Sequence, residues 1–221
     1  MNRANEKQSY QDLIVQQSQL SALDASALSI NRNNLSVILH RNVTLSGRWL
    51  NHHTLYLDNR QMNGKPGFFV ITPFEFEDKQ SGELQTILIQ RGWAARNFMD
   101  RTLLPVIQTE TGRLNIIGRI APAPSKLYEF NGDGIGKIRQ NVSIRELEKE
   151  FNIKLLDFSI LQLDSETASN NNDGLLRQWL QPSLGVEKHL GYMFQWWALS
   201  ALIAGLYLWF QVIRPLRQSG I

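Results

Sequence analysis

The chain has 221 residues, of which 43% are hydrophobic, and a formal net charge of +3 at pH 7. This length accommodates one domain of ordinary size and one membrane helix. Lysine and arginine are scattered rather than clustered, which disfavours nucleic-acid binding. The absence of cysteine excludes disulfides, thiolate chemistry and cysteine-ligated metal centres.

Residues 1–34 predict an N-terminal helix followed by a loop. Apolar residues between Tyr10 and Leu20 fall at near-helical spacing, so we expect a helix over residues 5–22. The segment Asp24–Asn34 is expected to be a loop. The stretch Met1–Gln19 is polar and contains neither a signal peptide nor a membrane span.

Residues 35–186 predict a β-rich domain. Short runs of β-branched or aliphatic residues, bounded by glycine, proline or asparagine, are typical of strands. These runs are Val37–Leu39, Val43–Leu45, Thr54–Leu57, Phe68–Thr72, Thr86–Ile89 and Leu114–Ile117. Turns are expected at Asn63-Gly64 and Pro66-Gly67. The expected fold class is mainly β with flanking helices, built on an antiparallel sheet for which a barrel is one arrangement.

The second half of this domain predicts a helix, a strand and a polar loop. Ser143 and Glu146 form a capping box in front of a short helix. Ile153–Leu163 is expected to be a longer strand. Asp164–Gly174 is rich in asparagine and serine and is expected to be a mobile loop.

Residues 187–213 predict a C-terminal transmembrane helix. Its core, Tyr192–Ile213, carries no formal charge and would reach roughly 33 Å at a helical rise of about 1.5 Å per residue. Tryptophans lie near both ends, where aromatic belts occur. Two arginines follow in the tail 214–221, and this favours a cytoplasmic C-terminus.

The predicted helix has two unlike faces. Small residues on one face would allow a second membrane helix to approach closely, and they are Ala198, Ala201, Ala204 and Gly205. His189, Tyr192 and Trp196 lie roughly on the opposite face.

No catalytic motif is recognisable, so an enzyme is not supported. The chain has no Gly-x-Ser-x-Gly elbow, phosphate-binding glycine loop or HExxH motif. His52 and His53 are adjacent, and in an extended chain they would point to opposite faces. Asp58 and Arg60 are interpreted as a solvated ion pair that closes a hairpin.

Arg91-Gly92-Trp93 ends a predicted strand and has two interpretations. The glycine permits a bulge, which would bring the arginine and the tryptophan to the rim of the sheet. In the structural interpretation the arginine caps a tryptophan packed at the rim. In the functional interpretation the guanidinium binds an anionic group such as a haem propionate.

Five motifs occur together in a specific order. They are Leu57-Asp58-Asn59-Arg60, Gly64-Lys65-Pro66-Gly67, Val70-Ile71-Thr72-Pro73, Gln90-Arg91-Gly92-Trp93, and His189-Leu190-Gly191-Tyr192 followed by Gln195-Trp196-Trp197. With them the chain closely resembles, from about Arg3 to Arg214, the surfeit locus protein family of cytochrome c oxidase assembly factors. The family implies a domain outside the inner membrane, between two membrane helices, that helps haem a reach oxidase subunit I.

The resemblance also implies a location and partners. We expect a bacterial inner-membrane protein whose β domain faces the periplasm. The expected partners are subunit I of the oxidase, haem a synthase and membrane lipid, with no nucleic acid. In that family a first membrane helix precedes a stretch similar to Asn2–Lys7, with which this chain begins. We therefore expect that Met1 is not the natural start.

The resemblance further suggests a site for haem a. His189 is expected to bind the haem iron, since neutral imidazole is a common axial ligand, with Tyr192 and Trp196 beside it. Arg60 and Arg91 are expected to hold a haem carboxylate. The alternative is a structural scaffold that holds oxidase subunits together and never binds haem.

Overall fold

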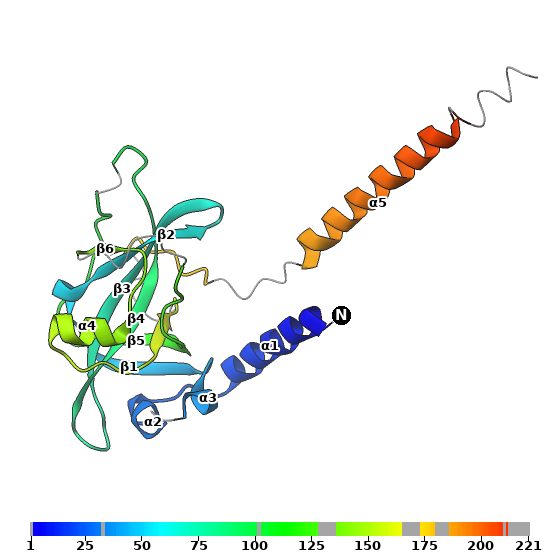
Figure 1. Ribbon diagram of the computed structural model, residues 1–221. Helices are drawn as coiled ribbons and strands as arrows, with labels where there is room; N and C mark the ends of the chain where they lie inside the picture. Colours follow the sequence, from blue (N-terminus) through cyan, green and yellow to red (C-terminus); the bar gives the residue numbers. More distant parts are fainter. Residues whose placement is uncertain are drawn as a thin grey trace, which may run out of the picture. The chain divides into compact units, whose positions relative to one another are not determined.

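The computed structural model describes residues 2–31, 34–100, 103–127, 136–164, 173–179, 186–209 and 211. The chain divides into two compact units. One unit is Asp12–Trp179, which contains the strands (Figure 1). The other combines Met1–Gln11 with Leu180–Ile221.

Five strands of the larger unit form a closed, barrel-like ring. They are β1 (Asn42–Trp49), β3 (Lys65–Glu77), β4 (Leu84–Ala95), β5 (Leu114–Ala121) and β7 (Ser159–Gln162). The hydrogen-bonded order β1-β5-β7-β4-β3 is closed by pairing of β3 with β1, so these strands leave no open edge between them. The sheet continues from β3 to β2 (Leu55–Met62) and β6 (Ile138–Arg139). Only β4–β7 and β2–β6 pair in parallel among the described strands, which confirms the predicted, mostly antiparallel β domain.

Gly47 allows the ring to close. It pairs with Phe76 where β1 crosses β3, and a Cβ atom at this position would lie 2.1 Å from the backbone oxygen of Glu75. Any larger residue would push the two strands apart, because backbone atoms cannot give way as a flexible side chain can. Gly47, two residues after the predicted run Val43–Leu45, thus lies inside β1 where this strand pairs with β3.

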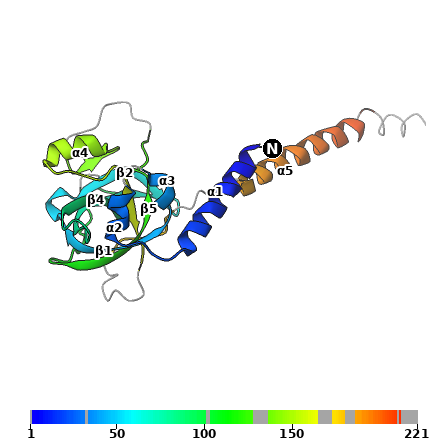
Figure 2. The same cartoon turned by 90° about the horizontal axis from the view of Figure 1, so that it is seen from below.

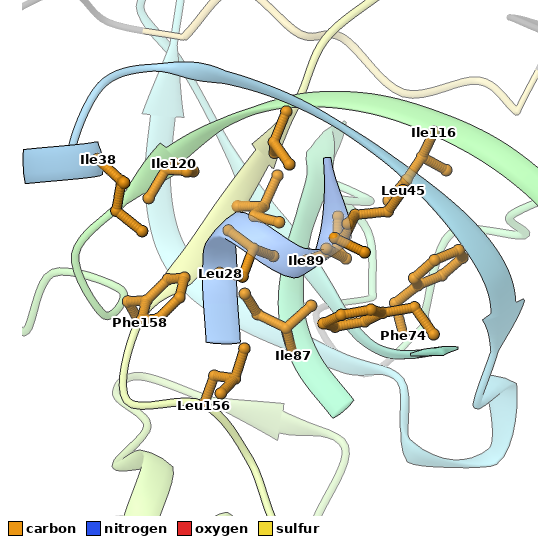
Figure 3. Packing of buried hydrophobic residues seen from close by; sticks show 14 of the residues in the cluster. Leu28, Ile38, Leu45, Phe74, Ile87, Ile89, Ile116, Ile120, Leu156 and Phe158 are labelled. Carbon is orange, nitrogen blue, oxygen red and sulfur yellow. The ribbon is translucent and has the colours of Figure 1, made fainter. Parts of the chain in front are cut away.

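The core fills the inside of the ring (Figure 3). Alternate residues of the strands point inward, as the period of two in a pleated strand requires. The fully buried side chains include Phe74, Ile87, Ile89 and Phe158. Leu28 joins them from the short helix α2 (Ala25–Ile30), which lies across one end of the strands (Figure 2).

A second cluster covers the outer face of β2, β3 and β4. It places Ile144 and Leu147 of helix α4 (Ile144–Phe151) against Leu55, Ile71 and Leu88. The helix begins directly after Ser143, as the capping-box spacing predicted, although the Ser143 side chain forms no cap hydrogen bond. Burial of the apolar face thus accounts for this helix better than its cap does.

Two predictions for residues 24–39 are wrong. The expected loop Asp24–Asn34 contains α2, for which the Asp24 carboxylate accepts a hydrogen bond from the Ala27 amide at 3.3 Å. The expected strand Val37–Leu39 is helix α3 (Leu35–Ile38). Ile38 is the buried residue of this turn, so packing against the core overrides the strand preference of β-branched residues.

Three further boundaries differ from the prediction. Pro66-Gly67 lies within β3 rather than in a turn. The expected strand Ile153–Leu163 is reduced to β7, because Leu155 and Leu156 contribute to two different clusters from an irregular segment. The two-residue strand β6 was not predicted. Residues 165–172 of the expected mobile loop lie outside the described part of the chain.

The two long helices are α1 (Asn2–Gln19), which confirms the predicted N-terminal helix, and α5 (Val186–Leu208). From Phe194 to Tyr207 the side chains of α5 are exposed. Most of them are large and apolar. A helix that is apolar on every side needs protein or lipid around it.

Within the residues that the structure describes, no helix is both long enough and apolar enough to cross a membrane. The transmembrane helix expected over 187–213 is therefore not supported. The described helix begins with Val186, Glu187 and Lys188, ends at Leu208, and includes the polar Gln195 between its aromatic residues. Residues 210, 212 and 213 of the predicted span lie outside the described part.

Candidate functional site

Arg91 lies at a bulge of β4. The β3–β4 register shifts between Val70 and Ile71, and Gly92 pairs with Val70, so the predicted bulge is confirmed. Arg91 and Trp93 are each only 3% exposed, so near the end of β4 both side chains are covered by the protein. β4 continues to Ala95, and another segment covers the bulge.

That segment is the strap, which we define as residues 173–179. Trp93 and Leu176 exchange two backbone hydrogen bonds of 2.8 Å, so the strap runs antiparallel beside β4. A Cβ atom at Gly92 would lie 2.8 Å from the Leu175 Cβ, so this close contact requires glycine. The Trp179 indole also donates to the Gln162 carbonyl at 2.6 Å.

The Arg91 guanidinium connects the bulge with two distant segments. It donates to the Thr109 hydroxyl at 2.7 Å and to the Gln108 carbonyl at 3.3 Å, both in the connection between β4 and β5. It also forms an ion pair of 3.5 Å with Asp173 of the strap. The guanidinium carbon lies 4.7 Å from the centre of the Trp49 ring, within cation–π range.

Asp173 is shared by two buried arginines. Besides its ion pair with Arg91, it accepts a short hydrogen bond from Arg177, four residues further along the strap. Arg177 also pairs with Asp164 at 3.0 Å, and the Asp164 side chain is largely exposed. Asp173 is thus the buried counter-charge that two guanidinium groups have in common.

Burial sets the pKa values in this region. It lowers the pKa of Arg91, an effect that the charge of Asp173 opposes. An arginine nevertheless remains protonated in a protein. Burial also raises the pKa of Tyr56, against the influence of the nearby Arg91 charge. Arg91 therefore keeps a fixed positive charge inside the protein.

Arg60 lies in different surroundings. Its guanidinium donates to the Ser125 carbonyl at 2.8 Å, to the Gln140 carbonyl at 3.0 Å and to the Ser125 hydroxyl at 3.3 Å. The expected ion pair with Asp58 is wrong, since Asp58 pairs with Arg96 at 3.2 Å. Burial alone lowers the pKa of Arg60. Arg60 and Arg91 bind different partners and form no common site.

Neither arginine fits a haem carboxylate as the structure stands. Both are buried, at 5% and 3% exposure, and the NH1 and NH2 groups of each already donate to the protein. An incoming carboxylate would have to replace these bonds. Each Nε atom is buried without a hydrogen-bond partner among the described residues, but it is not accessible from solvent. The role of the two arginines in haem binding stays a prediction.

The remaining predicted site residues belong to α5. Trp196 is exposed and offers a flat apolar surface. His189 and Tyr192 lie in the helical backbone, and their side chains are outside the described part. Their predicted contact with haem therefore also stays a prediction.

The histidine pair lies in a helical turn rather than in an extended chain. His52 and His53 belong to the 3₁₀ turn η1 (Asn51–His53), and their rings are 3.9 Å apart, contrary to the predicted opposite orientation. His53 stacks on Phe151 at 4.1 Å. Among the described residues, no group of three or more potential metal ligands occurs.

Comparison with known proteins decides the family. Residues 1–201 match the SURF1 family, which covers most of the chain. The chain belongs to the SURF1 family. A segment of 54 residues is also 39% identical to yeast (Saccharomyces cerevisiae) cytochrome oxidase assembly protein SHY1. This segment is 24% of the SURF1-family chain and only 13% of the yeast protein. The resemblance stated from the sequence motifs is thereby confirmed.

The sequence interpretation of this SURF1-family chain missed three residues that surround Arg91. Thr109, Asp173 and Arg177 all bind within one network, yet up to 82 residues separate Asp173 from Arg91. The only local signal is the spacing of four between Asp173 and Arg177, which by itself is typical of a solvated ion pair. No pattern in the chain indicates that the strap returns to the bulge of β4.

Proposed function

We propose that this chain assists the assembly of cytochrome oxidase at a membrane. Membership of the SURF1 family carries this proposal, and the yeast relative bears the name of a cytochrome oxidase assembly protein. The exposed apolar side chains of α5 support membrane association, because lipid or a membrane protein would cover them.

The test is genetic. Deletion of the encoding gene in its own organism should lower cytochrome oxidase activity and the haem a absorbance of the membranes several-fold. Expression of the full chain from a second locus should restore both. Normal oxidase content after deletion, in cells that contain no second member of the family, would contradict the proposal.

The finer proposal is that the chain handles haem a on its way to subunit I. His189 would bind the iron, and Tyr192 and Trp196 would form an apolar wall beside it. Imidazole is suited to this role, and the exposed Trp196 ring supports it by offering a surface for a flat macrocycle. We leave Arg60 and Arg91 out of this site because their terminal nitrogens bind the protein.

A visible absorption spectrum tests the finer proposal. The purified full chain, incubated with haem a, should give a ligated haem band that His189→Ala abolishes and His189→Met shifts. The control variant is His52→Ala, which removes an exposed histidine of the 3₁₀ turn. Identical spectra for the unaltered chain and both His189 variants would show that His189 is not the ligand.

The competing function is that of a scaffold for oxidase subunits. The closed ring of strands favours this function, because a closed sheet is a rigid body. The two buried arginines also favour it, because both already donate hydrogen bonds to the protein itself. A scaffold should copurify with oxidase subunits whether or not haem a is present. If His189→Ala leaves both copurification and oxidase activity intact, the scaffold function is the better description.

A further inference from the structure

The connection between β4 and β5 exposes large apolar side chains at one end of the barrel. We define the outer loop as residues 96–100 and 103–107. Phe98 is 79% exposed, Met99 96% and Val106 94%. In Figure 1 this connection projects at the top of the β domain, and the β3–β4 hairpin, residues 78–83, projects at the bottom. Such exposure of apolar side chains so close together in the chain is unusual for a surface that only faces water.

The exposed tip is held by its own turn. The Asn97 side-chain oxygen accepts hydrogen bonds from the amides of Met99 at 2.8 Å and Asp100 at 3.1 Å. An asparagine side chain used in this way replaces a backbone turn and restricts the residues that follow it. Phe98 and Met99 are therefore presented to the outside by local geometry.

The base of the outer loop is anchored to the barrel on both sides. On the outgoing side the Arg96 amide donates to the Pro66 carbonyl at 3.3 Å. On the returning side Leu104 and Ile107 pack against the cluster that contains Tyr56. The two residues that follow the loop, Gln108 and Thr109, accept the hydrogen bonds of Arg91. Because its base is fixed, Phe98 and Met99 at the tip can move from water into apolar surroundings without unfolding the domain.

The same end of the barrel receives the strap. The outer loop begins directly after β4, and the strap pairs with β4 at Trp93, two residues before that strand ends. In the sequence, α5 begins seven positions after Trp179, the last residue of the strap. The outer loop and the strap thus lie at the same end of the β domain.

The exposure favours lipid over a protein as the partner. A side chain that is 96% exposed lines no groove, and a protein partner would need a complementary surface at such a position. A bilayer surface is fluid and needs no matching shape, and apolar side chains at a loop tip gain free energy by entering it.

We infer that the outer loop inserts Phe98 and Met99 into the surface of a lipid bilayer and so holds one end of the barrel against the membrane. This inference rests on the membrane association proposed above, but it does not depend on a role in oxidase assembly. Its test uses vesicles without oxidase, so the two proposals can fail separately.

Fluorescence at a single introduced cysteine tests the insertion. The chain has no cysteine, so Met99→Cys and Lys79→Cys each provide one attachment point for an environment-sensitive dye. Lys79 is exposed in the β3–β4 hairpin and is the matched control. With full chain reconstituted in vesicles of phosphatidylcholine and phosphatidylglycerol, the dye at position 99 should shift to the blue and be quenched by nitroxide-labelled lipid. The dye at position 79 should do neither.

Vesicle binding gives a second measurement. Phe98→Ser combined with Met99→Ser should weaken vesicle binding roughly tenfold, since two large apolar side chains no longer leave water. Leu84→Ser removes an exposed apolar residue at the hairpin end and should leave binding unchanged. All variants should keep the melting temperature of the unaltered chain.

Three outcomes would overturn the inference. The first is a dye at position 99 that stays in water, as at position 79. The second is equal vesicle binding of the double variant and the unaltered chain. The third is shielding of position 99 only after purified oxidase is added, which would identify a protein partner instead.

Discussion

The buried arginines Arg91 and Arg60 solve the same physical problem in different ways. Arg91 meets a carboxylate, Asp173, and the face of Trp49. Arg60 meets only neutral oxygen atoms, from Ser125 and Gln140, and forms no ion pair with any residue that the structure describes. Both side chains are almost completely removed from water. Burial of a charge is costly in either case, so the contacts of each guanidinium must compensate its loss of hydration.

The difference lies in what each arginine joins. Arg91 holds the end of the outer-loop connection and the strap against β4, and its acid partner comes from far along the chain. Arg60 joins Ser125 and Gln140, which lie on either side of residues 128–135. The Asn141 side chain supports the same place through two hydrogen bonds with the Leu127 backbone. Arg91 therefore organises the end of the barrel that we connect with the membrane, whereas Arg60 joins the two described segments that contain Ser125 and Gln140.

The largest expected loss of unfolding free energy is that of Asp173→Asn. This change leaves Arg91 without its carboxylate and Arg177 with only the exposed Asp164. Loss of one partner from a buried ion pair typically costs about 3 kcal/mol of unfolding free energy, which corresponds to a fall in melting temperature of roughly 6–12 °C. Calorimetry of the purified chain measures this fall.

The matched control for this prediction is Asp164→Asn. Its side chain is mostly solvent-exposed, so the loss of its ion pair with Arg177 should cost less than about 1 kcal/mol. Similar losses for the two variants would mean that the Asp173 carboxylate is not the important counter-charge.

A smaller loss of unfolding free energy is expected for Arg60→Met. Arg60 binds no carboxylate among the described residues, so the variant leaves no buried negative charge without a partner. An apolar side chain of similar length can occupy the buried space. Two carbonyl oxygens lose their donor, so we expect a loss of about 1–2 kcal/mol. Hydrogen exchange at the Leu127 amide, which donates to Asn141, should accelerate as the contact between the two segments weakens. A destabilisation larger than that of Asp173→Asn would contradict the proposed difference between the two arginines.

The smallest effect concerns a third arginine, Arg139, whose partner Glu150 is 40% exposed. The hydrogen bond from Arg139 is the main cause of a lowered pKa of Glu150 in the folded chain. The folded state therefore binds this proton less readily than the unfolded state does. The contribution to stability is present above about pH 4.3 and is lost as the pH falls through the lower pKa of the folded state.

Removing the carboxylate with Glu150→Gln should cost less than about 1 kcal/mol at pH 7, because solvent screens the pair. It should also flatten the stability curve between about pH 5 and pH 3. Denaturant titrations at several pH values measure both effects. The control variant is Glu146→Gln, which changes an exposed residue of the same helix. A curve as steep for Glu150→Gln as for this control would refute the prediction.

The sequence predicted most strands because their apolar residues recur on one face and breakers bound them. The runs within β1, β2, β3, β4 and β5 were all identified, although each strand proved longer. The prediction failed at Val37–Leu39, where a β-branched residue and its neighbours form a helical turn that inserts Ile38 into the core. It also failed for Asp58 and Arg60, which are close in sequence but bind different segments, because a register shift separates Leu57 from Arg60.

By itself the sequence determined the β class, the bulge at Gly92 and, through motifs in a fixed order, membership of the SURF1 family. These are local properties, since periodicity, turn residues and short motifs need no distant partner. Only the tertiary structure decided that Arg91 is buried, that Asp173 neutralises it and that Phe98 and Met99 remain exposed on a fixed loop. Burial and pairing depend on which segments the closed ring brings together, and no pattern along the chain specifies a contact between residues 82 positions apart.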